Sequence, residues 1–409
     1  MRTAHDTVAE TVRVEGARIL ATLIRTVGDV QTAQDAVQEA VIAALATWPV
    51  SGVPPQPRAW LTVTARRKAI DILRRERVRP GKEEEGTRML DLARTDLPSD
   101  EVVHDDLLRL VFTCCHPALS PPTQVALALR TLCGLSPAQI AGVLLTTEAA
   151  TEKRLTRARR KIAAARIPYR VPPPHELPDR LPAVCGVIHS LYTAGHAPVG
   201  GAAAYDVDAC TEAVRLATLL HTLLPDQPAP AAVLALLLLT EARRPARLDA
   251  AGAVVTLDRQ DRGRWDAALI ARGITLLNAS LLASSRRADA YQLQAAIAAE
   301  HARAASYDTT DWPEILRLYD LLMSVAPSPA AGLARAVAAA EAAGAGAGLT
   351  LLADLPPTPR WHAVRAELLA RAGRHAEAVQ ALTASLVGPA TDAERRHRAA
   401  RLAELRALL

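Results

Sequence analysis

The densest cationic run in the sequence lies between Lys153 and Lys161 and has the spacing of one side of a helix. Six of these nine residues are Lys or Arg, while Thr151, Leu155 and Ile162 recur at helical spacing on the other side. Guanidinium and ammonium groups placed in this way bind phosphates, and residues near the helix start reach base edges in a major groove. The alternative is an ordinary solvated helix. The density of cations favours contact with nucleic acid.

Two helices separated by a short polar turn are expected over residues 136–162 to position this run. Ser136 is placed to cap the first helix, and Pro137 suits its first position, where no backbone N–H is needed. Thr147 offers a second cap, and the charge of Glu148 suits the positive end of the next helix dipole. This order is the pattern of a helix-turn-helix with its cations on the second helix.

A second basic helix is expected from Pro57 to Arg79. It follows a turn, Pro49 to Pro57, whose four prolines should prevent a helix and fix a rigid loop. Its outer side carries Arg and Lys side chains. Trp60, near its start, could present its ring to an unstacked base, although packing in a core is the commoner fate of a single Trp.

Two helices are expected ahead of that turn, from Thr7 to Val27 and from Thr32 to Trp48, with a break at Gly28 and Asp29. The second has a polar face that is acidic although its surroundings are basic. On physical grounds alone, this face serves equally well as a docking surface for a protein or as a plain solvated side.

Composition places the chain in the all-α class. It has 409 residues, of which 50% are hydrophobic but only 3% aromatic, enough for two or three domains built almost wholly from helices. Residues 1–167 hold 24 Lys and Arg against 19 Asp and Glu, whereas residues 168–409 hold 24 against 24, so the net charge of +5 belongs to the first part. The longest apolar stretch, Ala229 to Leu239, is far too short to span a bilayer, and a cytoplasmic protein without a membrane partner is expected.

The five cysteines are expected to be reduced and mostly buried, because their uneven spacing forms no paired framework. They are Cys114, Cys115, Cys133, Cys185 and Cys210. Cys114, Cys115 and His116 do not predict a metal site, since adjacent side chains on a helix diverge by about 100° and no second ligand pair follows. No metal or other cofactor is expected.

Carboxylates that could act as acid and base gather around one tryptophan. Asp258, Asp261 and Asp266 alternate with arginines beside Trp265. An ion-paired corner that fixes helix packing is the better interpretation, because no Gly-rich phosphate loop, metal-spaced His pair or nucleophile motif accompanies the cluster. We therefore do not expect an enzyme.

The order of elements resembles a bacterial extracytoplasmic-function (ECF) sigma factor of the sigma-70 family. The resemblance rests on GDVQTAQDAVQEAVIAALATWP, then PRAWLTVTARRKAIDILRR, an acidic linker and the basic helix-turn-helix. It implies that residues 7–79 are sigma region 2, which binds the β′ coiled coil of core RNA polymerase and melts the −10 element. It implies that residues 106–166 are region 4, which reads the −35 element of promoter DNA. Residues 80–105 would be the acidic linker.

The candidate site residues fall into three sets. The physical argument contributes Trp60 and Arg160, and the resemblance implies the others. The set for core polymerase docking is Asp29, Asp35, Gln38 and Glu39. The set for the −10 element is Trp60, Arg66, Arg67, Asp71, Arg74 and Arg75. The set for the −35 element is Glu148, Glu152, Lys153, Arg154, Arg157 and Arg160. Val41 stands where the family commonly has an aromatic residue, and Phe112 is the only Phe, so the details of base capture at the −10 element stay open.

The chain continues beyond the length of a minimal sigma factor. Pro168 to Pro182 is expected to be a semi-rigid, extended connector, followed by a helical domain over residues 183–409. Its expected helices include Trp312 to Val325 and Pro329 to Ala343. The segment RAELLARAGRHAEAVQALTASL is similar to a tetratricopeptide (TPR) helix pair. EARRPARLDAAG, LDRQDRGRWD and YQLQAAIAAEHA resemble the TPR-like C-terminal extension of one ECF subfamily, which implies regulation through this domain.

The alternative function is a helix-turn-helix transcription regulator with a helical sensor or oligomerisation domain. The helix from Thr32 to Trp48 is followed directly by a second DNA-facing helix. This pair favours the sigma factor, because a regulator with one helix-turn-helix does not require it. The partners expected of a sigma factor are core RNA polymerase, through its β′ and β subunits, and promoter DNA. A protein or peptide ligand of the C-terminal domain is expected as well.

Overall fold

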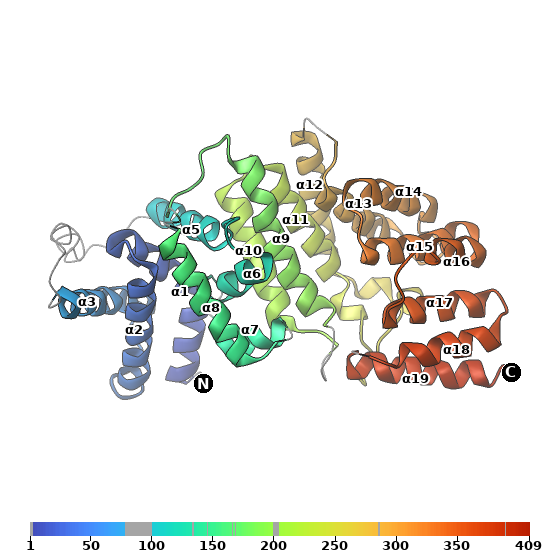
Figure 1. Ribbon diagram of the computed structural model, residues 1–409, viewed down its shortest axis with the longest axis horizontal. Helices are drawn as coiled ribbons and strands as arrows, with labels where there is room; N and C mark the ends of the chain where they lie inside the picture. Colours follow the sequence, from blue (N-terminus) through green and yellow to red (C-terminus); the bar gives the residue numbers. More distant parts are fainter. Residues whose placement is uncertain are drawn as a thin grey trace. The chain divides into compact units, whose positions relative to one another are not determined.

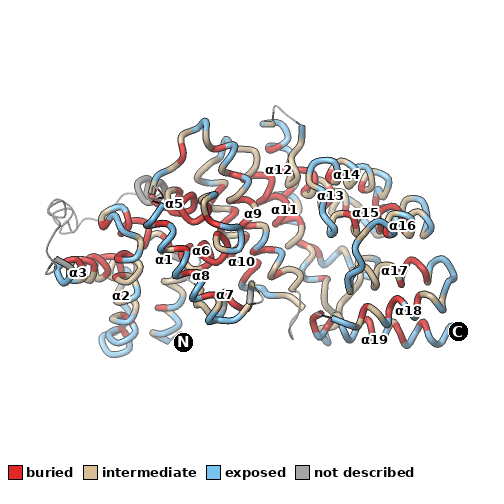
Figure 2. Tube along the Cα trace, in the orientation of Figure 1, coloured by how far each residue is buried: buried red, intermediate tan, exposed pale blue. Residues whose placement is uncertain are grey.

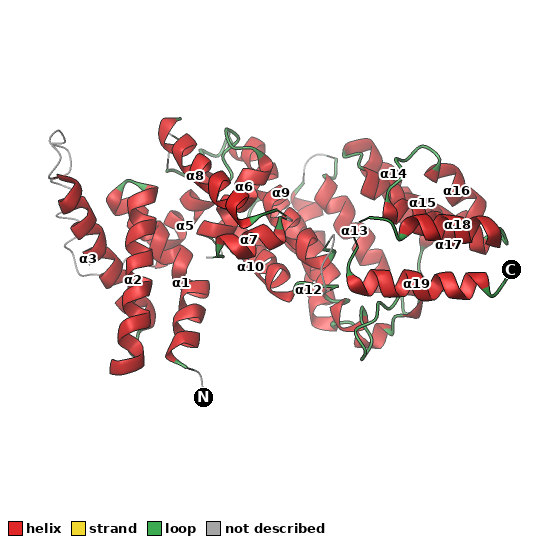
Figure 3. Cartoon of the chain, turned by 60° about the horizontal axis from the view of Figure 1, so that its bottom comes forward, coloured by secondary structure: helices red, strands yellow, loops and turns green. Residues whose placement is uncertain are grey.

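The protein is all-helical in the part that its computed structural model describes. That part comprises residues 3–77, 100–132, 135–144, 146–165, 167, 169–198, 204–284, 287–388 and 390–409. These residues contain no β-strand (Figure 3), and one isolated antiparallel bridge joins Leu248 and Val254. The expected all-α fold class is confirmed. The chain divides into two compact units, Met1–Val187 and Ile188–Leu409.

Three helices open the first unit (Figure 1). They are α1 (Ala4–Val27), α2 (Val30–Ser51) and α3 (Pro57–Arg77), and α2 packs against both others. Gly28 ends α1 in the left-handed region at φ 76°, where a residue without Cβ is not strained. Asp29 then caps α2 by accepting from the Thr32 N–H at 2.7 Å. The predicted break at Gly28 and Asp29 is confirmed.

The proline-rich turn starts later than expected. α2 continues through Pro49 to Ser51, and the Gly52 N–H donates to the Trp48 carbonyl at 3.1 Å. The expectation that no helix extends into this turn is therefore wrong for its first residues. A proline so close to a helix end removes a single intrahelical hydrogen bond, which the last turn tolerates.

Four more helices complete the region that was expected to bind the −35 element. They are α5 (Asp100–Cys114), α6 (Pro121–Thr131), α7 (Pro137–Val143) and α8 (Glu148–Ala164). The predicted linker, residues 80–105, is too long at its C-terminal end, because α5 begins at Asp100; residues 78–99 lie outside the described residues. The helix-turn-helix of α7 and α8 is present, and the Thr147 hydroxyl accepts from the Ala150 N–H at 3.2 Å, as expected of a cap.

The predicted connector, Pro168 to Pro182, is not extended along its whole length. Helix α9 (Leu177–His196) begins inside it, with Pro178 in its first turn, where a proline needs no hydrogen-bond partner. The Arg180 guanidinium donates to the Phe112 carbonyl of α5 at 3.0 Å. This part of the connector is therefore a helix that belongs to the first unit and contacts α5.

The second unit is a succession of helices that pack mainly on their neighbours in the chain. After α9 come α10 (Val207–Leu223), α11 (Pro228–Glu241), α12 (Ala267–Ala283), α13 (Ala290–Arg303), α14 (Trp312–Val325), α15 (Pro329–Ala343), α16 (Ala345–Leu352), α17 (Pro359–Arg371), α18 (His375–Ser385) and α19 (Asp392–Arg406). In Figure 2 the central helix α11 is buried along most of its length, and every residue from Pro230 to Leu239 is buried. This arrangement is compatible with a TPR-like solenoid without establishing TPR repeats.

Two glycines of the second unit stand where a side chain would not fit or would strain the backbone. A Cβ on Gly348 of α16 would lie 2.7 Å from the Ala336 carbonyl oxygen and 2.8 Å from the Ala340 Cβ, so only glycine lets α16 approach α15 this closely. Gly373 lies between α17 and α18 at φ 74°, a conformation that suits the predicted turn of this helix pair. The sequence did not predict α16, because its segment AGAGLTLL combines weak periodicity with two glycines.

The charged segment 258–266 fixes helix packing as expected, but through backbone groups. The Arg262 guanidinium donates to the carbonyls of His301 and Ala304, each at 2.7 Å. Asp266 caps α12 by accepting from backbone N–H groups. Within this described segment, the ion pairs that the sequence suggested are not found, so the expected ion-paired corner is wrong in its chemistry.

Candidate nucleic-acid and polymerase interfaces

Helix α8 presents an exposed cationic face above a buried stripe. The stripe consists of Thr151, Leu155, Ala158 and Ile162, none more than 8% exposed, and α8 packs through it on α6 and α7. The exposed residues of the −35 set are Glu148, Glu152, Lys153, Arg157 and Arg160, and Arg154 is half-buried. The structure therefore gathers all six candidates on one helix and leaves five of them accessible.

Acidic and cationic groups occupy different parts of α8. Glu148 and Glu152 lie in its first turns, where a carboxylate can accept from a cytosine amino group. The cations follow from Lys153 onward, where they can meet phosphates. The Arg157 Nε donates to the Lys153 carbonyl at 3.3 Å, and Arg157 is an exposed residue.

Helix α3 exposes four of its six candidate residues, namely Arg67, Asp71, Arg74 and Arg75. Arg66 is only 7% exposed, so its expected position on the DNA-facing side is wrong. It lies one turn from Thr62 and close to Ala69, both buried, because the buried face of α3 is wider than the apolar residues alone indicate.

Trp60 packs against another tryptophan. Its ring lies 5.5 Å from that of Trp48, with the two planes at 73° in an edge-to-face arrangement. Such pairs stabilise cores, so the geometry favours the packing alternative over base contact.

Three of the four docking candidates make contacts within the chain. Asp29 caps α2, and the two Asp35 carboxylate oxygens accept from the Gln31 amide at 2.9 and 3.0 Å. Gln38 is exposed. Glu39 faces α3 instead and forms ion pairs with Lys68 at 3.4 Å and Arg75 at 3.6 Å. Half-exposed pairs of this kind contribute about 0–1 kcal/mol each, so a partner can displace them at little cost.

A cavity of about 250 Å³ lies beside this face and is also lined by α1, α6 and α8. It brings Asp35 and Gln38 of α2 close to Arg130 of α6 and Arg159 of α8. Burial, and then the neighbouring Arg159, lowers the pKa of Arg130. The sequence holds no signal for this juxtaposition, because the residues that form it are far apart in the chain and share no motif.

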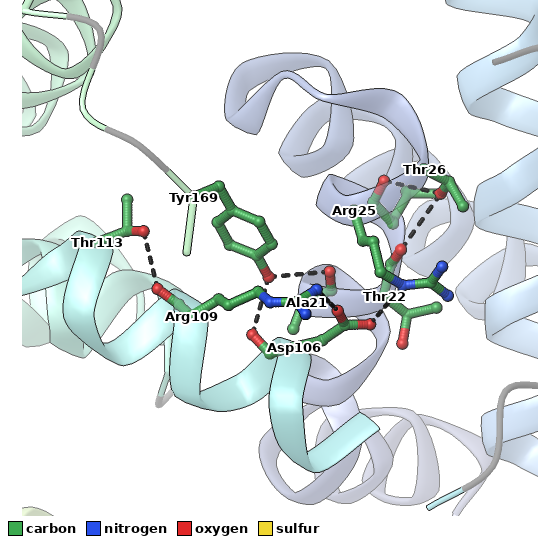
Figure 4. A network of polar contacts seen from close by, with 9 residues as sticks. Ala21, Thr22, Arg25, Thr26, Asp106, Arg109, Thr113 and Tyr169 are labelled. Atoms are coloured by element: carbon green, nitrogen blue, oxygen red, sulfur yellow. Dashed lines mark hydrogen bonds and ion pairs between the residues drawn. The ribbon is translucent and has the colours of Figure 1, made fainter. Parts of the chain in front are cut away.

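A polar network, drawn in Figure 4, joins α1 to α5. Asp106 is fully buried and accepts from Arg25 Nε at 2.9 Å and from Arg109 at 3.1 Å. The Tyr169 hydroxyl lies 3.0 Å from the Ala21 carbonyl oxygen and 2.9 Å from the Asp106 carbonyl oxygen. We call the contacts of Tyr169 with these two carbonyls the Tyr169 clasp. Burial, followed by the charge of Asp106, raises the pKa of Tyr169, so its single proton remains available to the two acceptors.

The described cysteines are buried, free thiols, as predicted. They are Cys114, Cys115, Cys185 and Cys210, and Cys133 lies outside the described residues. Burial raises the pKa of Cys114 and of Cys210 to about 12. The described residues contain no group of three or more His, Cys, Asp or Glu side chains arranged to hold a metal ion. None of the described helices has the length and apolar character that crossing a membrane requires.

Comparisons with known proteins match these elements one by one. The family described as Sigma-70 region 2 matches residues 12–79, Sigma-70, region 4 matches residues 109–162, and a family of unknown function, DUF6596, matches residues 180–281. The uncharacterized protein R00370 of Rhizobium meliloti is 39% identical over 365 residues, which cover 87% of this chain and 86% of that protein. A probable ECF RNA polymerase sigma factor, SigI of Mycobacterium tuberculosis, is 32% identical over 174 residues, or 41% of this chain and 59% of SigI.

A region 2 domain followed by a region 4 helix-turn-helix defines a sigma-70 family factor, a transcription initiation protein without catalytic activity of its own. More narrowly, this chain belongs to the ECF sigma factors and carries a helical C-terminal extension that includes the DUF6596 segment. Membership of the family implies binding to core RNA polymerase and to promoter DNA.

Proposed function

We propose that α8 reads the −35 element, that the exposed side of α3 contacts the −10 element, and that the C-terminal helical domain modulates initiation. The observation that carries this proposal is the face of α8, where exposed cations stand above a fully buried stripe on the second helix of a helix-turn-helix. The −10 set is Trp60, Arg67, Asp71, Arg74 and Arg75, with Trp60 acting through its packing and Arg66 omitted because it is buried.

The proposed docking surface is the polar side of α2. Gln38 and Asp35 are its accessible groups, and Glu39 becomes available when its exposed pairs with α3 open. Charged groups at the rim of such a surface steer encounter and fix register more than they add affinity. The proposed domains are region 2 at 7–79, region 4 up to residue 166 and the C-terminal domain at 183–409.

The C-terminal domain is proposed to act on the sigma domains or through a protein or peptide ligand. From residue 168 onward, 24 cationic residues balance 24 acidic ones, which argues against a general role of this part of the chain in holding DNA. Helices that pack on successive neighbours expose long surfaces suited to a peptide or a helix.

Run-off transcription with core polymerase tests the proposal. Three proteins are compared: the full chain, a chain that ends at residue 166, and a chain that ends at His196. The second truncation keeps Tyr169 and Arg180, which contact α1 and α5 within the first unit, so it separates loss of those contacts from loss of the C-terminal domain. If both truncated chains initiate at the level of the full chain under every condition, the C-terminal domain is not a regulator. Failure of the full chain to copurify with core polymerase would contradict the docking proposal itself.

A further inference from the structure

The second unit contains a cavity of about 590 Å³ whose polar lining is dominated by arginine. It lies between the end of α9, the start of α10, residues 243–260 and the helices α17 and α19. Four guanidinium groups line it, those of Arg243, Arg244, Arg247 and Arg360. The apolar part of the cavity wall consists of Pro245, Val254, Val255 and Leu257. This volume is within the range of about 300–1,000 Å³ that small-molecule sites occupy.

Three of the four arginines have partners in the protein. Arg244 Nε pairs with Glu241 at 2.5 Å, and Arg360 lies 3.5 Å from Glu394. Arg247 donates to the His196 carbonyl at 2.8 Å.

The histidine in this cavity is neutral and serves as an acceptor. Burial, and then the charges of Arg247, Arg243 and Arg360, lowers the pKa of His196 to about 3. Its Nδ1 lies 3.1 Å from an Arg247 nitrogen and can therefore accept from it. His196 adds no positive charge, but it fixes the Arg247 guanidinium, whose Cζ also lies 5.4 Å from the centre of the Tyr205 ring.

Arg243 differs from the other three because its charged neighbours are Arg247 and Arg262. The one carboxylate in the described lining of the cavity, that of Glu394, lies beside Arg360. The Arg243 guanidinium lies over the Trp265 ring at 5.2 Å, and Arg262 lies 4.9 Å from the same ring. The Arg243 Nε is buried without a hydrogen-bond partner, and no carboxylate in the described part of the chain forms an ion pair with it. Burial, followed by Arg247 and Arg262, lowers its pKa to about 10, so the group remains charged at neutral pH. A desolvated charge without a counter-ion is costly in a folded protein.

We propose that this cavity is a binding site for a small anionic molecule whose carboxylate or phosphate group pairs with Arg243. Guanidinium groups hold such groups through two parallel N–H donors, and an anion here also relieves repulsion among Arg243, Arg247 and Arg262. Three of the four lining arginines, Arg243, Arg244 and Arg247, come from the single segment RRPARLDAAG, and the fourth, Arg360, comes from α17. The site does not depend on whether the domain regulates transcription.

Calorimetric titration of the full-length protein tests the site. Inorganic phosphate and succinate are the two probes, and sodium chloride at matched ionic strength is the blank. We expect at least one probe to bind at a single site, with a dissociation constant at least about tenfold weaker in Arg243→Gln. Arg360→Gln, at a half-exposed rim position, should weaken binding as well without endangering the fold. Arg264→Gln, an exposed cation of the neighbouring segment that does not line the cavity, should leave binding unchanged.

The possible results distinguish a phosphate-bearing ligand from a carboxylate ligand, and two of them would overturn the proposal. Binding of phosphate alone assigns a phosphate-bearing ligand, and binding of succinate alone assigns a carboxylate. Equal binding by the parent and by Arg243→Gln, both folded by circular dichroism, would overturn the proposal because the anion would then sit elsewhere. Absence of binding by both probes above the chloride blank would also overturn it.

Discussion

Replacing Tyr169 by Phe should tighten the binding of core RNA polymerase by about fivefold. By their names the −10 and −35 elements lie about 25 base pairs apart, or about 85 Å at ~3.4 Å per pair. A compact unit of the size of Met1–Val187 has a radius of gyration of roughly 16 Å and is roughly 40 Å across. On the proposed assignment of α8 to the −35 element and α3 to the −10 element, region 4, which packs on α1 through α5, has to move away from region 2 before both elements can be read.

The magnitude follows from the contacts of the Tyr169 clasp. Its hydroxyl reaches a carbonyl of α1 and a carbonyl of α5 at once, at 3.0 and 2.9 Å, and an open form loses one of these contacts. A net hydrogen bond of this kind contributes about 1 kcal/mol, which changes the ratio of open to closed forms about fivefold. When the open form is the minor one, the apparent affinity for a partner that needs it rises by the same factor.

Equilibrium binding of labelled core polymerase to Tyr169→Phe and to the parent measures this effect. Tyr319→Phe is the matched control, because Tyr319 is a partly buried tyrosine of the second unit that packs on a hydrophobic core. The variant should also unfold about 1 kcal/mol more easily in its first unit. Unchanged or weaker binding of core polymerase by a folded Tyr169→Phe would refute the requirement for opening.

Three further outcomes are expected. Charge reversal at both Asp35 and Glu39 should weaken binding of core polymerase in a pull-down with little loss of thermal stability, because the pairs of Glu39 are exposed; unchanged binding would exclude the docking surface. Lys153→Ala should cost about 1–3 kcal/mol of promoter affinity in a manner that depends on the −35 sequence, whereas Arg160→Ala should weaken all sequences alike and lower the salt slope by about 1; a uniform loss in both would make α8 a backbone clamp. Burial and neighbouring arginines lower the pKa of His301 to about 3, so below pH ~6.5 the unfolded chain binds a proton that the folded chain does not. The free energy of unfolding therefore decreases as the pH is lowered, by about 2 kcal/mol at pH 5. His301→Gln should remove this pH dependence from urea unfolding curves.

Local signals in the sequence located most helices. α14 and α15 have the predicted bounds because each starts with a side-chain cap followed by a proline in its first turn, Asp311 with Pro313 and Ser328 with Pro329. The buried stripe of α8 follows from periodicity alone. The same signals misplaced α9, since a proline that usually marks a connector also fits the first turn of a helix, as Pro178 does.

Features that depend on distant partners could not be predicted. Nothing in the residues around Tyr169 indicates that its hydroxyl meets a carbonyl 148 residues earlier. Arg66 belongs to a run of cations whose members look alike in sequence, and only the packing of α3 separates the buried one from its exposed neighbours. The arginine-lined cavity likewise brings Arg360 next to residues more than a hundred positions away.

The neighbour-on-neighbour packing of the second unit has a mechanical consequence. In such a stack the free energy of unfolding is approximately a sum of terms for each helix and for each interface with the next, so a pulling force applied at Leu409 should detach α19, α18 and α17 stepwise. The arginine-lined cavity interrupts this stepwise order of detachment, because α17 and α19 line it together with residues 243–260, a much earlier segment. A molecule bound there would fasten the last helices to that segment, and the force record would change from several small steps to one larger rupture.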